Sequence, residues 1–90
     1  MKDSGKPVAR LRNLGPASAA MLAAVEVRTL EELRVLGAVR AYLRLKTAFP
    51  RRVSRNMLWA IAAGLDDRDW RDLTAEEKSR LLAEVRRRSR

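Results

Sequence analysis

The groups best placed for chemistry in this sequence are backbone N–H groups at one predicted helix start. In the segment LRNLGPASAA, residues 11–20, a Leu-Gly-Pro turn stands directly before an alanine-rich stretch, and Pro16 suits the first position of a helix. The first N–H groups of a helix have no partner within it and carry partial positive charge, so they can bind an anion such as phosphate. The predicted anion-binding set is Gly15, Ala17 and Ser18 as donors, with Arg12 and Arg28 beside them.

The net charge of +9 is distributed unevenly. Residues 34–55 contain seven basic residues and no acidic one, and the last five residues, RRRSR, are also strongly basic. Such a segment attracts the phosphates of nucleic acids or acidic partners, although a run of charge is often only a solvated face. The predicted contacts to nucleic acid are Arg40, Arg44, Arg51, Arg52 and Arg55, and the other candidate site is the tail, at Arg86, Arg87, Arg88 and Arg90. Because no helix carries Asn, Gln and Arg at groove-facing spacing, binding to duplex DNA is expected to be non-specific.

The composition argues against catalysis. The sequence contains no cysteine and no histidine, which removes disulfides, thiolate metal ligands and the usual proton shuttle at neutral pH. Four glutamates, Glu31, Glu32, Glu76 and Glu77, fall in predicted first turns of helices, where negative charge stabilises the helix. We therefore expect no enzymatic activity, metal, cofactor or small-molecule substrate. The short, charge-interrupted hydrophobic runs predict a cytoplasmic protein without a signal peptide or membrane span.

The elements that position these groups are predicted to be five helices. Their expected starts are Pro16, the capping boxes Thr29–Glu32 and Thr74–Glu77, the residue after Gly37, and Ser54. The predicted helices cover about 16–25, 29–36, 38–49, 55–65 and 74–85. No segment shows the alternation of a strand, so the predicted fold is an all-α, small five-helix bundle. The expected organisation is a flexible basic arm over 1–10, a helical domain over 11–85 and a basic tail over 86–90.

Apolar spacing predicts which side chains fill the core. The main stripe of the fourth helix consists of Met57, Leu58, Ile61 and Leu65. Trp59 lies outside that stripe and Met21 lies beside small alanines, so these two residues could either complete the core or contact a partner protein. In the polar connection DDRDWRDL, Trp70 and Leu73 are expected to anchor the chain to the core.

Longer stretches of the chain resemble known elements. The form L-x-x-L-G-P-x-S-A, followed by a helix and TLEEL, resembles the helix-hairpin-helix element, which binds DNA phosphates through backbone N–H groups at the start of its second helix. With NMLWAIAAGL and WRDLTAEEKSRLL, residues 11–82 are similar to the C-terminal domain of the TfoX/Sxy family of bacterial competence regulators. The resemblance implies an all-helical domain without catalytic activity, linked in that family to transcription of DNA-uptake genes and natural transformation.

Two residues depart from the hairpin pattern. Ala17 stands where related hairpins often have lysine or glycine, and Glu26 stands where a glycine commonly ends the first helix. A left-handed Glu26 is expected to strain the turn by roughly 1 kcal/mol. The expected function is a regulatory domain that binds nucleic acid weakly through a basic face. The alternative is an adaptor that docks on a transcription factor or another subunit without contacting DNA.

Overall fold

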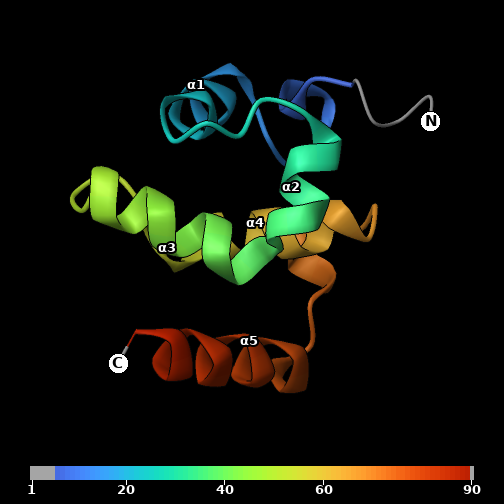
Figure 1. Ribbon diagram of the computed structural model, residues 1–90. Coiled ribbons are helices and arrows are strands. Elements are labelled where there is room, and N and C mark those ends of the chain that lie inside the picture. The colour runs from blue at the N-terminus through green and yellow to red at the C-terminus, as the bar shows by residue number, and fades with distance from the viewer. Residues whose placement is uncertain (1–5, 90) are drawn as a thin grey trace.

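The computed structural model describes residues 6–89, and within them the fold is all-α with no strand. Five α-helices are present in this range, together with two short 3-10 helices, η1 (Val8–Arg10) and η2 (Trp70–Asp72). The α-helices are α1 (Pro16–Ala24), α2 (Leu30–Leu36), α3 (Ala38–Ala48), α4 (Arg55–Leu65) and α5 (Ala75–Arg88). In Figure 1, α1 and η1 form the top layer, α3 and α4 pack against each other in the middle, and α5 lies below them. The predicted fold class is confirmed.

Most predicted helix starts are confirmed. Thr29 and Thr74 form complete capping boxes, because each threonine hydroxyl accepts the N–H of the glutamate three residues on and that glutamate accepts the threonine N–H. Pro16 occupies the first position of α1. Ser54 precedes α4 as predicted, but its side chain makes no capping hydrogen bond. Gly37 separates α2 from α3 with a φ of 88°, a conformation that glycine adopts without strain.

Residues on both sides of the predicted helical domain of 11–85 also take part in the fold. Val8, expected in a flexible arm, is buried, and its N–H donates to the carbonyl of Arg28 at 3.0 Å. The N–H of Leu30 donates in turn to the carbonyl of Lys6 at 2.9 Å. The predicted tail begins within the last turn of α5, which extends to Arg88 because no breaker interrupts it. Residues 1–5 of the predicted arm and Arg90 of the predicted tail lie outside the described residues.

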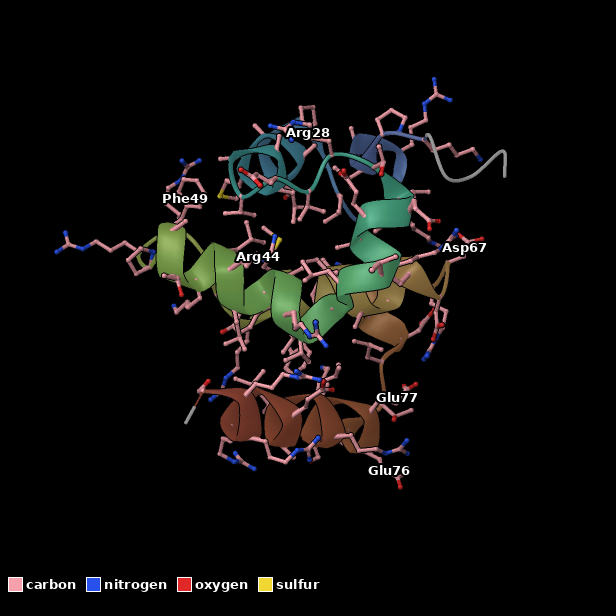
Figure 2. The ribbon with its side chains drawn as sticks, viewed as in Figure 1. Arg28, Arg44, Phe49, Asp67, Glu76 and Glu77 are labelled. Carbon is pink, nitrogen blue, oxygen red and sulfur yellow. The ribbon has the colours of Figure 1, made fainter. Side chains whose placement is uncertain are left out.

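The core is built around α3 and α4. Leu58 and Ile61 are fully buried as predicted, whereas Met57 and Leu65 are half-buried at the edge. Leu73 anchors the connection before α5, but Trp70 does not, since it is 37% exposed. The side chains of α5 reach up toward α3 and fill the space between the two helices in Figure 2. Leu81, Leu82 and Val85 supply this half-buried contact.

Trp59 and Met21 belong to the core. Their exposed fractions are only 7% and 8%. Trp59 is covered because α4 is packed on several sides and Lys78 of α5 places its ammonium 5.5 Å from the ring centre. Neither side chain is presented to a partner, so the structure favours the packing role over the interface role for both residues.

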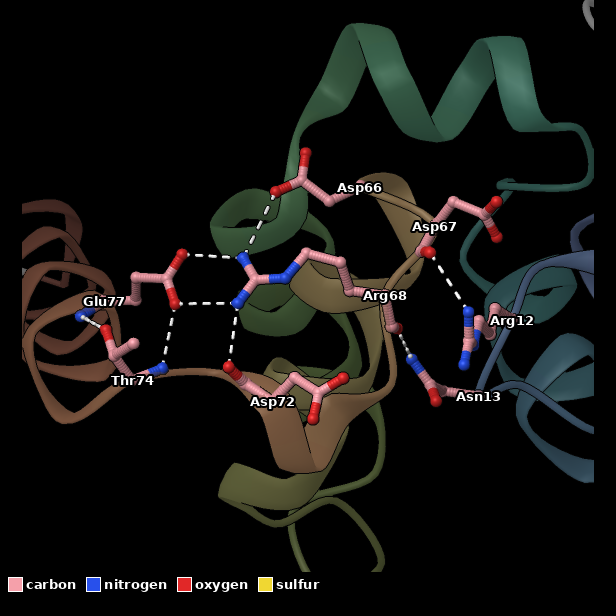
Figure 3. Close-up of polar contacts among 8 residues, drawn as sticks. All are labelled: Arg12, Asn13, Asp66, Asp67, Arg68, Asp72, Thr74 and Glu77. Carbon is pink, nitrogen blue, oxygen red and sulfur yellow. Dashed lines mark hydrogen bonds and ion pairs between the residues drawn. The ribbon is translucent and has the colours of Figure 1, made fainter.

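An ionic network joins the end of α4 to the start of α5 (Figure 3). The guanidinium of Arg68 donates to both carboxylate oxygens of Glu77, at 2.7 and 3.0 Å, and to the carbonyl of Asp72 at 2.8 Å. Glu77 also accepts the N–H of Thr74 at 2.8 Å. Hydrogen bonds from Arg68, and then from the Thr74 backbone, lower the pKa of Glu77 from 4.5 to about 2.

The stability of the domain is therefore expected to fall in acid. Because the folded-state pKa of Glu77 lies below its ordinary value, the stabilisation is present above about pH 4.5 and is lost as the pH falls toward 2. Melting temperatures of the wild type and the Glu77→Gln variant, measured from pH 7 to 2, should differ most at neutral pH and converge near pH 2. If the difference in melting temperature between the two proteins is the same at every pH, Glu77 does not contribute to the loss of stability in acid.

Candidate nucleic-acid interface

A hollow of about 320 Å³ lies where the starts of α1 and α4 approach each other. Ser18 lines it from α1, and Arg52 lines it from the α3–α4 turn. The complete lining is Asn13, Ser18, Arg52, Ser54, Asn56, Met57, Ala60 and Trp70. Most of these side chains are polar. The hollow brings together an arginine, an indole ring and the first turns of two helices.

The backbone at the start of α1 suits an anion. Gly15 is extended, with φ −111° and ψ −173°, and no atom lies within 4 Å of the position that a Cβ would take there. The N–H groups of Ala17 and Ser18 belong to the first turn, where a helix supplies no acceptor, and Ala17 is exposed. All three predicted donors thus lie at an accessible helix start, and Ser18 lies on the hollow itself.

The two arginines predicted to flank this helix start lie elsewhere. Arg12 turns toward the end of α4, where its Nη1 donates to the carbonyl of Asp67 at 3.2 Å (Figure 3). It lines a different hollow, beside Lys6 and Arg34. Arg28 follows the end of α1 instead of its beginning, and its exposed side chain is seen near the top of Figure 2. The structure therefore does not bring Arg12 or Arg28 to the predicted anion site.

The basic segment 34–55 divides into two surfaces. Arg51, Arg52 and Arg55 are exposed at the corner where α3 turns into α4, and Arg52 lies 5.7 Å from the centre of the Phe49 ring. We call these three residues the arginine corner. Lys46 is used internally, because its Nζ donates to the carbonyls of Pro50 and Val53 at 3.1 and 2.8 Å. The arginine corner adjoins the hollow through Arg52.

Arg40 and Arg44 lie on the second surface, a groove between α2 and α3. Both line this groove together with Glu26, Glu31 and Glu32. The Nη1 of Arg44 donates to the carbonyl of Val25 at 3.2 Å, and Figure 2 shows its side chain between α3 and the top layer. Because acids from an earlier part of the chain stand beside these two arginines, the five predicted contacts do not form one continuous positive face.

Asn13 and Trp70 are two residues of the hollow that the sequence analysis did not assign to a site. Asn13 has a φ of 75°, and its Nδ2 donates to the carbonyl of Arg68 at 2.8 Å. Its Oδ1 accepts the N–H of Trp70 at 3.3 Å. Asn13 thus fixes Trp70 at the rim of the hollow. An aromatic residue within the otherwise polar DDRDWRDL is a signal that could have indicated an exposed ring.

The described part of the chain holds no cluster of three or more carboxylates or other potential ligands arranged for a metal ion. Among residues 6–89, no helix is long and apolar enough to cross a membrane.

Comparisons with known proteins agree with this architecture. The crystal structure of an uncharacterized protein from Listeria monocytogenes superposes with a TM-score of 0.80 at 22% sequence identity, covering 92% of this chain and 93% of that chain. At this identity the likeness shows a shared fold. No curated protein shows significant similarity to the chain. The sequence model of the TfoX C-terminal domain matches residues 5–85, which include η1 and extend well into α5. The chain therefore belongs to the TfoX C-terminal domain family.

Proposed function

We propose that this chain is a non-enzymatic regulatory domain that binds nucleic acid weakly and without sequence specificity at the arginine corner and the adjoining hollow. The observation that carries the proposal is that Arg52 and Ser18 line the same hollow although they are far apart in the sequence. Folding thus places an exposed arginine of the basic segment beside the helix start after the Leu-Gly-Pro turn.

The chemistry of this surface suits a phosphate backbone. Guanidinium groups form charge-assisted hydrogen bonds to phosphate oxygens, and the three arginines of the corner can contact successive phosphates. The N–H groups at the start of α1 add donors that a phosphate accepts. Trp70, exposed at the rim, offers a ring on which an unpaired base can stack. None of these groups distinguishes one base pair from another, so the expected binding is non-specific.

Membership of the TfoX C-terminal domain family supports a role in regulation. The resemblance to competence regulators points to the transcription of DNA-uptake genes as the process in which the domain acts. In that role, weak binding to DNA would hold the domain near a promoter while a transcriptional regulator supplies sequence recognition.

Removing the arginine corner is expected to lower affinity for duplex DNA by about tenfold or more at low salt, because each lost guanidinium removes a charge-assisted contact to phosphate. The variant is Arg51→Ala/Arg52→Ala/Arg55→Ala, and the measurement is fluorescence anisotropy with a labelled duplex of random sequence. All three side chains are exposed, so stability should change little.

The matched control is Arg86→Ala/Arg87→Ala/Arg88→Ala, which removes the same charge from exposed positions at the end of α5. Its affinity should remain close to that of the wild type. If the control variant loses affinity and the corner variant does not, the site lies on α5 and the proposal is wrong. If the wild type fails to bind even at low salt, the adaptor function is favoured.

A further inference from the structure

The groove between α2 and α3 contains Val35, the most exposed large hydrophobic side chain among residues 6–89. Val35 of α2 is 75% exposed, twice the exposed fraction of Trp70. The groove has a volume of about 430 Å³, and its apolar lining also includes Val27 and the half-buried Leu36. An isolated exposed valine is ordinary, but here it stands in a groove with other apolar side chains.

The two walls of this groove carry opposite charges. Glu31 and Glu32 line it from α2 and Glu26 lines it from the turn before α2, whereas Arg40 and Arg44 line it from α3. Two of these groups already have partners: Glu32 accepts the N–H groups of Arg28 and Thr29, and Arg44 donates to Val25. Within the described residues, Glu31 and Arg40 have neither an ion pair nor a side-chain hydrogen bond. The walls therefore do not neutralise each other across the groove.

The spacing along each helix aligns these groups. Glu31 and Val35 are four residues apart on α2, as are Arg40 and Arg44 on α3, so each pair projects from one side of its helix. Gly37 lets α3 leave α2 at an angle (Figure 1). Residues of both helices line the groove. The result is a surface with an acidic side, a basic side and an exposed valine.

A surface of this kind is complementary to itself. In a dimer with two-fold symmetry, the same patch of each copy meets its counterpart after a rotation of 180°, so a group on one side faces the opposite side of the partner. With the axis along the groove, that rotation places Glu31 of one copy near Arg40 of the other, twice over, and covers the exposed Val35 side chain of each copy. We propose that this groove is the interface of a homodimer of the domain.

Sedimentation equilibrium tests the proposal over a range from about 1 µM to about 1 mM, where weak protein complexes dissociate. The wild type is expected to pass from monomer to dimer within this range, and Val35→Glu should remain monomeric throughout. Val35 is largely exposed, so the variant should keep the helical circular dichroism of the wild type. The matched control is Arg34→Glu, which reverses a charge on α2 outside this groove and should still dimerise.

Charge reversal distinguishes this arrangement from other dimers. Glu31→Arg and Arg40→Glu should each be monomeric, since each places like charges opposite each other twice. An equimolar mixture of the two variants should form a heterodimer, because both opposing pairs then carry opposite charges. A wild type that stays monomeric to about 1 mM, a Val35→Glu variant that still dimerises, or a mixture that does not associate would each overturn the proposal.

Discussion

Replacing Asn13 with alanine is expected to lower the free energy of unfolding by about 3 kcal/mol. The Nδ2 of Asn13 donates to the carbonyl of Arg68, and its Oδ1 accepts the N–H of Trp70, so one side chain holds the turn after α4 against the turn before α1. Each such bond contributes about 1 kcal/mol net. The backbone of Asn13 is also left-handed, with a φ of 75°, and alanine tolerates this conformation less well by roughly 1 kcal/mol.

The glycine variant separates these two contributions. Asn13→Gly loses the hydrogen bonds but keeps a residue that adopts positive φ readily, so it should be destabilised by about 2 kcal/mol, less than Asn13→Ala. Urea denaturation followed by circular dichroism measures both values. If the glycine variant is as stable as the wild type, the side-chain hydrogen bonds do not hold the two turns together.

Replacing Gly64 with alanine is expected to lower the free energy of unfolding by about 2 kcal/mol, although alanine is normally the better helix residue. Gly64 lies buried in α4, and a Cβ there would stand 2.5 Å from the carbonyl oxygen of Arg12 and 3.0 Å from two carbons of Leu11. A backbone oxygen cannot rotate away as a side chain can. Overpacking of this kind typically costs about 1–3 kcal/mol, and a fixed backbone oxygen at this distance places the cost at the upper end of that range. About 2 kcal/mol therefore remains after the gain of about 1 kcal/mol in helix propensity.

Gly15 supplies the matched control. It accommodates a Cβ in open space at an allowed φ of −111°, so Gly15→Ala should cost less than about 1 kcal/mol, as expected for a change at a helix N-cap. Thermal and urea unfolding of the two variants give the comparison. A Gly64→Ala variant as stable as Gly15→Ala would show that α4 can move away from the Leu11–Arg12 backbone without loss.

The helices were predictable because their signals are local. A capping box lies within four residues, so Thr29 and Thr74 could be assigned from the sequence alone. Glu26 stands where a glycine commonly ends the first helix, and its φ of 69° is left-handed. Gly64 and Asn13 were not singled out, since the atoms that they contact lie about fifty residues away in the chain.

The candidate site was predicted only in part, for the same reason. Residues 34–55 contain no acidic residue, so the sequence suggests a purely basic surface. In the fold, however, Glu26 and Glu31 from the preceding segment lie beside Arg40 and Arg44. The start of α1 was predicted as an anion site. Arg52 lies beside it only because the start of α4 packs next to the start of α1, which the sequence does not show. Trp59 lies off the main stripe of α4, and it is nevertheless buried because other elements pack on several sides of α4 and Lys78 of α5 lies over its ring.

The salt dependence of duplex binding tests the central claim most directly. Each phosphate neutralised by an arginine contributes about −0.9 to the slope of log K against log salt, so three contacts at the arginine corner predict a slope of about −2.7 for the wild type. The Arg51→Ala/Arg52→Ala/Arg55→Ala variant should bind with a slope near zero, whereas Arg86→Ala/Arg87→Ala/Arg88→Ala should keep the wild-type slope. A corner variant with an unchanged slope would contradict the proposal that this surface binds nucleic acid.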